Sequence, residues 1–439
     1  MVMKKPYLFI LLLFCLPAAL KAQSMHDTIS RENKLYALSM IWKEADYNFV
    51  FFDKQPQLNW DSLYMAYIPK ILDTKNAYQY LEVLDSFLGS LNDGHTSVLV
   101  NQFFYNDIDS PPIHYVKQYG KLFVTAIDES LVDQIPIGSE IEALDGKKWS
   151  ALNRDYNWYG FKNTSVELSL KLPNGKAKKI SVNRNANTRA RAKILKWVPA
   201  PPVSGAKDFE YKSLSSEVAM VTLNSFSNAE IVDDFKKALP EIRKHKNLIV
   251  DIRRNDGGDD AYAIEIAKYL TDKPYLVGSM WSARTNNSAK KAWASSDKMY
   301  KKTNLDDPYL TRNSWERHPG DTISISDTIH RLKMPVYILT SKKTFSAGED
   351  FLIYLNGSKN ILKIGQNTSG SSGQPLIFDI PGGFTVRICA KRDAFPDGTD
   401  FIGIGVKPDI YVEPFFSLTG EEKDVELEKT LSLIAAQKH

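Results

Sequence analysis

The chain has 439 residues, of which 43% are hydrophobic and 25% charged, and these ordinary globular values exclude a mainly disordered or fibrous protein. Its length exceeds what one hydrophobic core usually supports, so we expect two or three domains. The formal net charge is only +4, from 56 basic and 52 acidic residues. No long basic run alternates with aromatic residues, so we do not expect nucleic acid as a partner.

The N-terminus has the pattern of an export signal. Lys4 and Lys5 precede an apolar run over residues 7–20, and Ala22 provides a small residue for cleavage. We therefore predict a signal peptide over residues 1–22. The mature chain would be periplasmic or extracellular, with no stable transmembrane anchor after cleavage, because no other apolar stretch is long enough to span a bilayer.

The two cysteines restrict the chemistry of the mature chain. Cys15 ends a Leu-Leu-Phe-Cys stretch that resembles a lipoprotein site, but bulky Phe14 stands where a small residue is needed, so we expect no lipid anchor. Removal of the signal leaves Cys389 as the remaining cysteine, which excludes an internal disulfide and a cysteine-based zinc site. No metalloprotease helix motif occurs, and we expect neither a metal nor a cofactor.

The first predicted domain is a helical segment over residues 23–100. Apolar residues recur at helical spacing over residues 31–50, and leucines repeat the pattern over residues 81–91. The turn formers Asn-Asp-Gly at residues 92–94 end the second helix before a short β-branched run. His95 therefore lies at a junction between a helix and a strand.

A β-rich module is predicted over residues 105–195. Short strand patterns such as residues 122–126 and 139–144 are separated by Gly and Pro turns. The module ends at a Pro-rich linker over residues 196–207, where prolines stiffen the chain and no core-forming period continues.

The remaining residues, 208–439, alternate strand and helix patterns, which predicts βαβ units around a buried parallel sheet. Helices are expected over residues 229–245 and directly after Ser346. The expected strands are residues 218–223, 248–252, 335–340 and 361–364. The aromatic segment over residues 279–320 interrupts this order, and it is either a lid or cleft wall, or a surface insertion.

Ser346 follows one of these strands and precedes an apolar helix. At a helix N-terminus, backbone amides and the helix dipole favour developing negative charge, which suits an attacking hydroxyl with an adjacent oxyanion hole. A structural alternative remains open, since Ser-x-x-Glu over residues 346–349 is also a capping box.

A second polar feature is the glycine-rich turn after the strand that contains Asp251. Paired glycines let the backbone approach a ligand closely, so the amide of Gly257 or Gly258 could form an oxyanion hole together with that of Ala347. An ordinary turn at the end of a strand is the alternative.

Together these features resemble the C-terminal processing peptidases, the family of the tail-specific proteases and of the tricorn protease core. The nucleophile motif Ser-Ala-x-Glu appears as residues 346–349, and Asp-x-Arg-x-Asn-x-Gly-Gly over residues 251–258 is similar to the family's oxyanion strand. Residues 135–146 look like the turn and strand of a PDZ module, and residues 405–410 resemble the end-of-core motif. The resemblance implies an α/β fold with a helical segment, a PDZ-like module and a crotonase-like core in this order.

The family activates its serine in two ways. Ser371 occupies the place of the lysine that the tail-specific branch uses, whereas Asp-Gly-His-Thr at residues 93–96 matches the histidine of the tricorn-like branch. The resemblance therefore implies His95 as general base, a role that suits the ordinary pKa of histidine. Gly94 replaces the serine of that branch, and Ile402 stands where its glutamate is expected.

The residue that orients the histidine is left open among four candidates, namely Ser371, Asp93, Asp397 and Asp400.

The resemblance implies a serine endopeptidase that hydrolyses peptide bonds of exported proteins or peptides. The PDZ-like module would bind an extended peptide or a free C-terminus by adding it as a strand. Two alternatives remain open because residues 94 and 402 depart from the family pattern. One is a catalytically weak or inactive peptide-binding protein on the same fold, and the other is acyl-thioester chemistry, which an exported protein would have little coenzyme A to support.

Overall fold

The computed structural model describes residues 29–100, 107–149, 158–186, 196–198, 207–301, 307–311, 313–415 and 423–437. The predicted signal peptide and most of the predicted linker lie outside these residues. None of the described helices has both the length and the apolar character needed to span a bilayer.

The N-terminal part is helical, as predicted, and its helices are α1 (Arg31–Asn48), α2 (Trp60–Leu72) and α3 (Ala77–Gly89), with a 3₁₀ turn at Phe52–Lys54. Each helix begins at a side-chain cap, because Ser30, Asn59 and Asn76 each accept a hydrogen bond from the amide three residues ahead. After α3 the chain forms β1 (Ser97–Leu99), which pairs antiparallel with β21 (Phe384–Cys389). A strand from the C-terminal half therefore joins the helical part through the sheet β1-β21-β20, where β20 is Pro375–Ile380.

The β-rich part has its own hydrophobic core, which includes Leu122, Ile141 and Leu168. Its main sheet has the order β10-β4-β5-β8-β9, with β3 paired to β4 and β6 paired to β5. The strands are β3 (Ile113–Gln118), β4 (Lys121–Asp128), β5 (Glu140–Leu144), β6 (Lys147–Lys148), β8 (Ser165–Lys171), β9 (Ala177–Asn183) and β10 (Trp197–Val198). A 3₁₀ turn covers Glu129–Leu131, and a separate pair joins β2 (Ile108–Asp109) to β7 (Gly160–Phe161).

The α/β part is built on a six-stranded sheet of order β11-β12-β13-β18-β19-β23, in which every pair except β11 with β12 is parallel. The strands are β11 (Phe209–Ser213), β12 (Val218–Leu223), β13 (Asn247–Asp251), β18 (Val336–Thr340), β19 (Ile361–Gly365) and β23 (Ile410–Tyr411). The helices are α4 (Glu230–Ile242), α5 (Asp260–Leu270), α7 (Ala347–Tyr354) and α8 (Val425–Ala436). The predicted βαβ alternation is thus confirmed.

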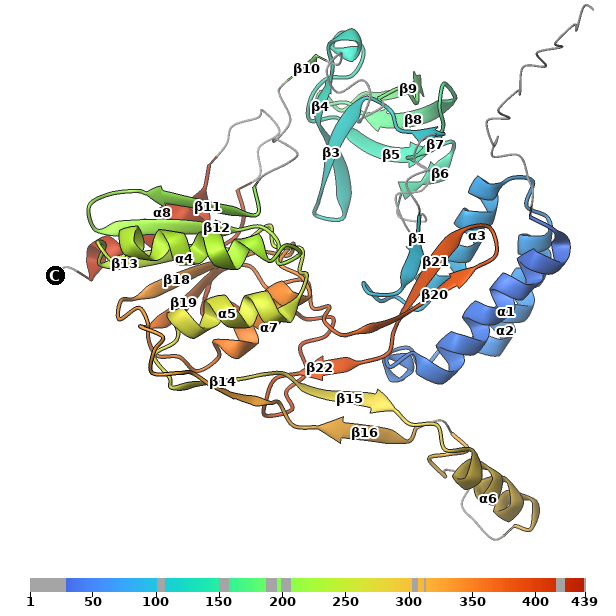
Figure 1. The fold of residues 1–439 in the computed structure, drawn as a ribbon. Coiled ribbons are helices and arrows are strands. Elements are labelled where there is room, and N and C mark those ends of the chain that lie inside the picture. Colours follow the sequence, from blue (N-terminus) through green and yellow to red (C-terminus); the bar gives the residue numbers. More distant parts are fainter. Residues whose placement is uncertain are drawn as a thin grey trace, which may run out of the picture.

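Helices cover both faces of this sheet (Figure 1). Alternate side chains of a strand point to opposite faces, so Val221 and Val250 pack in the cluster that contains α4, α5 and α7, whereas Met220 and Ile249 pack with Ile434 of α8. Burial on both faces accounts for the continuous apolar runs of these strands.

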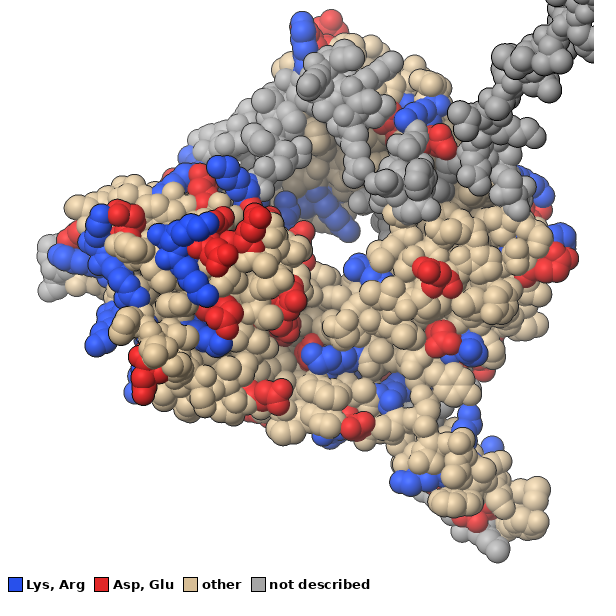
Figure 2. Space-filling view, in the orientation of Figure 1, with Lys and Arg blue, Asp and Glu red and all other residues tan. Residues whose placement is uncertain are grey.

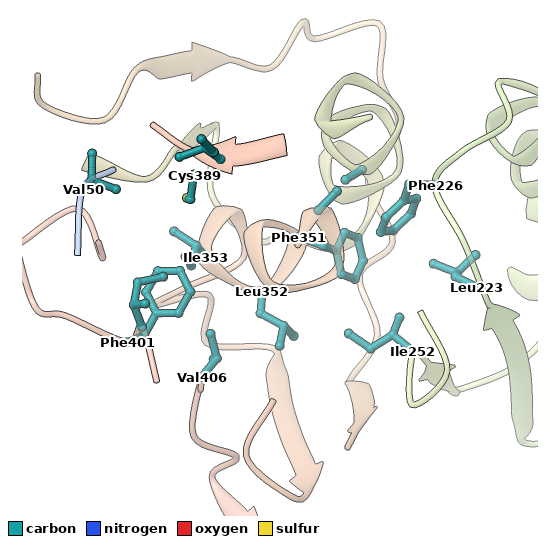
Figure 3. Packing of buried hydrophobic residues seen from close by; sticks show 14 of the residues in the cluster. Val50, Leu223, Phe226, Ile252, Phe351, Leu352, Ile353, Cys389, Phe401 and Val406 are labelled. Carbon is teal, nitrogen blue, oxygen red and sulfur yellow. The ribbon is translucent and has the colours of Figure 1, made fainter. Parts of the chain in front are cut away.

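α7 lies in the centre of the largest hydrophobic cluster. Figure 3 shows Phe351, Leu352 and Ile353 of this helix among side chains from separate elements, including Phe226 and Val406. All three residues of α7 are at most 1% exposed. The residue at the start of α7 is therefore carried by one of the most rigidly packed elements of the molecule.

The aromatic segment forms an arm that extends away from the sheet (Figure 1). It contains β15 (Met280–Arg284), α6 (Ser288–Met299) and β16 (Trp315–His318), and the paired strands β14 (Tyr275–Val277) and β17 (Thr322–Ser324) flank it. β15 also pairs with β22 (Arg392–Ala394). Trp293 of α6 is 67% exposed, and α6 lies at the far end of the arm from α7. The position of α6 agrees with the surface-insertion alternative, whereas Arg284 and Trp315 line a cavity together with Phe49, as the cleft-wall alternative describes.

Candidate active site

Ser346 occupies the turn between β18 and α7 in a conformation that is rare for a residue with a side chain, with φ 54° and ψ −124°. Such strain persists only where the surrounding structure imposes it. The Ser346 hydroxyl makes no capping hydrogen bond to α7, so the reading of this serine as a plain helix cap is wrong. Its Oγ lies instead 3.1 Å from Nε2 of His95.

His95 is buried between two hydroxyl groups. Its Nδ1 lies 2.9 Å from Oγ of Ser371, on the opposite side of the ring from Ser346. The ring also stacks on Phe345, with centroids 4.6 Å apart. Burial, together with the nearby charge of Arg387, lowers the pKa of His95 to about 4. The imidazole is therefore neutral at pH 7, and with its proton on Nδ1 it can donate to Ser371 and accept from Ser346.

Ser371 reaches His95 because residue 94 is a glycine. A Cβ atom at Gly94 would lie 2.7 Å from Ser371 Oγ and 3.1 Å from Cε2 of Phe345. Those distances are too short for undisturbed packing. The departure from the tricorn-like pattern at residue 94 thus leaves the space that the Ser371 hydroxyl fills.

The three carboxylates considered beside Ser371 have other contacts. Asp93 accepts hydrogen bonds from the backbone N–H of His95 and from Oγ1 of Thr96, so it holds the backbone rather than the ring. Asp397 caps the turn at Thr399. Asp400 forms ion pairs with Lys54 and Arg392. The structure therefore brings Ser371, and none of these carboxylates, to Nδ1 of His95.

Glu349 has a role that sequence reasoning did not identify. Its fully buried carboxylate accepts hydrogen bonds from Oγ1 of Thr368, from the amide of Gly370 at 2.7 Å and from the amide of Ser371 at 2.8 Å. Burial raises the pKa of Glu349, although these donors oppose the rise. The first turn of α7 thus holds the loop that carries Ser371. The Ser-x-x-Glu spacing indicated a local cap and contained no signal for a contact more than twenty residues away.

Of the three backbone amides predicted as oxyanion donors, one already makes a hydrogen bond within the protein. The amide of Gly257 donates to Oδ1 of buried Asn255 at 3.0 Å, so this structure leaves it engaged. The amides of Gly258 and Ala347 have no hydrogen-bond acceptor within the described part of the chain. Both glycines are required by the backbone, since a Cβ at Gly257 would lie 2.7 Å from Cβ of Ser346, and φ is 97° at Gly257 and 134° at Gly258.

A second buried group lies beside the site. Ser372, the residue after Ser371, donates a hydrogen bond to Asp350 at 2.7 Å and lies 3.2 Å from Asp393. Burial and the neighbouring carboxylates Asp260 and Asp393 raise the pKa of Asp350 well above its ordinary value, and Lys391 pairs with Asp393. Among the described residues, no group of His, Cys, Asp and Glu has an arrangement that could hold a metal ion.

A serine hydroxyl at a helix N-terminus, next to a neutral histidine, is the arrangement that serine hydrolases use for acyl transfer. Residues 217–412, within the α/β part of the chain, match the model of peptidase family S41. The resemblance to C-terminal processing peptidases is thereby confirmed.

Two plant and algal relatives carry the corresponding name. Carboxyl-terminal-processing peptidase 2, chloroplastic, of Arabidopsis thaliana is 23% identical over 263 residues, which cover 57% of this chain and 44% of that protein. The chloroplastic C-terminal processing peptidase of Tetradesmus obliquus is 26% identical over 199 residues, 45% of this chain and 35% of the relative. The match thus spans less than half the length of either relative.

Solved structures confirm the mixed α/β fold. Mature CPAF complexed with lactacystin has a TM-score of 0.63 at 15% identity, with 92% of this chain and 98% of that chain covered. A putative peptidase from Parabacteroides merdae has a TM-score of 0.52 at 20% identity, with 92% and 96% covered. At these identities the likeness establishes the fold alone.

Proposed function

We propose that this chain is a serine endopeptidase that cleaves exported proteins or peptides, with Ser346 as nucleophile and His95 as general base. The observation that carries the proposal is the hydrogen-bonded series Ser346–His95–Ser371, with distances of 3.1 and 2.9 Å. A base must lie within hydrogen-bond reach of the proton that it removes, and His95 meets this condition before any substrate is bound.

The first half of the reaction transfers the acyl group to the enzyme. Nε2 of His95 takes the Ser346 proton while Oγ attacks the peptide carbonyl carbon. The amides of Ala347 and Gly258 donate to the resulting oxyanion. The imidazolium then gives its proton to the amine of the leaving peptide, and the C–N bond breaks. In the second half, His95 deprotonates a water molecule that attacks the acyl ester, which releases the acid and restores Ser346.

In this proposal Ser371 orients the imidazole. A hydroxyl that accepts from Nδ1–H keeps the lone pair of Nε2 directed at Ser346, which is the tautomer that catalysis requires. A neutral hydroxyl stabilises the imidazolium less than a carboxylate does, because it supplies no negative charge. We therefore expect a slower peptidase than one with a Ser-His-Asp triad. A histidine base rather than a lysine also favours the tricorn-like branch of the family.

The three parts of the molecule have roles in this proposal. The six-stranded, mostly parallel sheet with helices on both faces would be a crotonase-like core, and the β-rich part would be a PDZ-like module that presents substrate. Figure 2 shows an opening through the molecule between the α/β part, the β-rich part and the helices. An extended polypeptide or a free C-terminus would enter there as an added strand.

The test is labelling of the purified mature protein with a fluorophosphonate probe, followed by mass spectrometry of the modified peptide. We expect stoichiometric labelling at Ser346 that is abolished by Ser346→Ala and reduced to background by His95→Ala. Ser369→Ala serves as the control, since Ser369 is an exposed serine of the loop that carries Ser371. A folded wild-type protein that is not labelled would remove the basis for the proposal.

A catalytically weak or inactive peptide-binding protein is the second candidate, and one observation favours it. The Nδ1 partner of His95 is the hydroxyl of Ser371 where other triads have a carboxylate. In that case the protein would bind unfolded polypeptides with an affinity that Ser346→Ala leaves unchanged, and the probe would not react.

A further inference from the structure

A large groove lies at the carboxyl ends of the parallel strands. Its volume is about 1230 Å³, and it is bounded on one side by strand ends of the α/β sheet and on the other by the turn between β3 and β4. We call it the strand-end groove, and its lining includes Lys117, Tyr119, Arg254, Lys342, Lys343 and Phe415. Ligands of open α/β proteins bind at this edge of the sheet, outside the carboxyl ends of the strands.

Three exposed cations lie together on the sheet side of the groove. Arg254 follows β13, and Lys342 and Lys343 follow the neighbouring strand β18. Hydrogen bonds tie the two loops together. Oγ of Ser341 donates to the carbonyl oxygen of Arg253 at 2.6 Å, and the amide of Phe345 donates to that of Asn255 at 2.9 Å. The loops are therefore fixed side by side with their cationic side chains in the same groove.

These three cations have no carboxylate within ion-pair distance among the described residues. The neighbouring Arg253 is different, because it pairs with Asp251, Asp424 and Glu426. Of the two other groove carboxylates, Glu210 pairs with Lys212 of its own strand, and Glu413 accepts a hydrogen bond from the Tyr411 hydroxyl and keeps its negative charge. The lining has six cations against five carboxylates, and the three cations without a carboxylate partner can attract anionic groups to this recessed surface.

The cations are close to the proposed nucleophile. Lys343 precedes Ser346 by three residues, a separation of at most about 10 Å along the backbone. An extended peptide advances about 3.3 Å per residue. A carboxylate within a few residues of the cleaved bond could therefore reach the groove.

We propose that the strand-end groove binds carboxylates of the polypeptide substrate near the cleaved bond, through Arg254, Lys342 and Lys343. The carboxylates come from Asp or Glu side chains or from a free C-terminus, which share the same chemistry. This inference rests on the proposed function, because it takes the bound polypeptide to be the substrate that Ser346 cleaves. The binding step needs no catalysis and can be measured separately.

The experiment uses the mature chain with Ser346→Ala, so that bound peptide is not consumed. Fluorescein-labelled peptides of one length carry either glutamates or glutamines at the same positions, each with a free or an amidated C-terminus. Fluorescence anisotropy gives Kd for all four peptides at low salt and at about 1 M salt, where the screening length falls to about 3 Å. The groove variant adds Arg254→Gln, Lys342→Gln and Lys343→Gln. The control variant instead adds Lys148→Gln, Lys236→Gln and Lys298→Gln, three exposed lysines outside the groove.

We expect carboxylate-bearing peptides to bind more tightly than their neutral counterparts at low salt. Exposed ion pairs change affinity by about twofold to fivefold each, so three together correspond to about tenfold to a hundredfold. The preference should shrink in high salt, be lost in the groove variant and persist in the control variant. A preference for glutamates identifies side chains as the source, and a preference that amidation removes identifies the C-terminus.

Equal affinity for all four peptides, or a preference that the groove variant retains, would overturn the inference. Reversal of the three charges to glutamate gives a second check, because that variant should prefer a lysine peptide over the glutamate peptide. If the wild-type protein fails to react with the fluorophosphonate probe while the preference holds, the proposed peptidase activity fails and the carboxylate site stands.

Discussion

The contact between residue 94 and Ser371 can be tested by a double-mutant cycle. Gly94→Ala places a Cβ atom 2.7 Å from Ser371 Oγ, so the hydroxyl must leave Nδ1 of His95. Ser371→Ala removes the same hydrogen bond by deleting the hydroxyl. In both variants a buried N–H loses its acceptor, which costs about 1–3 kcal/mol. Because 1.36 kcal/mol is a factor of ten, each substitution should lower kcat/KM by about fivefold to 150-fold.

The assay is kcat/KM for hydrolysis of a peptide substrate, with the rate of fluorophosphonate labelling as a second readout. The double variant should be about as slow as either single variant, because one hydrogen bond can be lost only once. Contacting residues show such non-additivity, whereas independent residues add. Ser369→Ala, in the same loop, should stay within about twofold of the wild type, as expected for a surface substitution.

Two results would refute this reasoning. If Ser371→Ala left kcat/KM unchanged, the hydroxyl would not orient the base. If the losses of the two single variants added in full, Gly94→Ala would act by a route other than Ser371. Thermal unfolding of each variant separates these results from a loss of the folded state.

Two further predictions concern titration and the buried carboxylate. Since the pKa of His95 is lowered to about 4, kcat/KM should hold from neutral pH down to about pH 5 and fall with a midpoint near pH 4, and a midpoint near 6.5 in the pH profile would contradict a buried base. The unfolded chain binds a proton at His95 at higher pH than the folded chain does, because the pKa is lowered only in the folded state. The free energy of unfolding that depends on His95 is therefore full above about pH 6.5 and decreases as the pH falls toward 4. Glu349→Gln should lower the free energy of unfolding by about 2–4 kcal/mol, because an amide NH₂ then faces the N–H of Gly370 or Ser371. Urea unfolding measures this loss, and an unchanged midpoint would mean that the carboxylate does not hold the loop.

Most local structure could be predicted from the sequence. The apolar runs of the parallel sheet and the helix that follows Ser346 agree with the observed β12, β13, β18, β19 and α7 to within one residue at each boundary of the strands. These elements are specified by periodicity and by turn formers, which are properties of short stretches of chain. The Ser346 and His95 hypotheses depended in addition on the family resemblance, since each motif alone had an ordinary structural explanation.

The partner of the histidine could not be selected in the same way. Four candidates were chemically suitable, and the sequence does not indicate which of them lies near Nδ1 of His95. The roles of Glu349 and Asn255 were missed for a related reason, because each residue acts through hydrogen bonds to backbone amides that almost any residue type supplies. The amide of Gly257 was predicted as an oxyanion donor because glycine permits the turn. Its N–H instead donates to Asn255, a contact that the sequence did not indicate.

By itself, the sequence determined where helices, strands and sharp turns form, and which residues have the chemistry of a nucleophile or a base. Only the tertiary structure decided which of these residues meet. His95 lies 251 residues before Ser346 and 276 residues before Ser371, so their contact depends on how β1 pairs with β21 and on how α7 packs in the core. Such long-range packing is the sum of many weak contacts spread over the whole chain, and no local pattern encodes it.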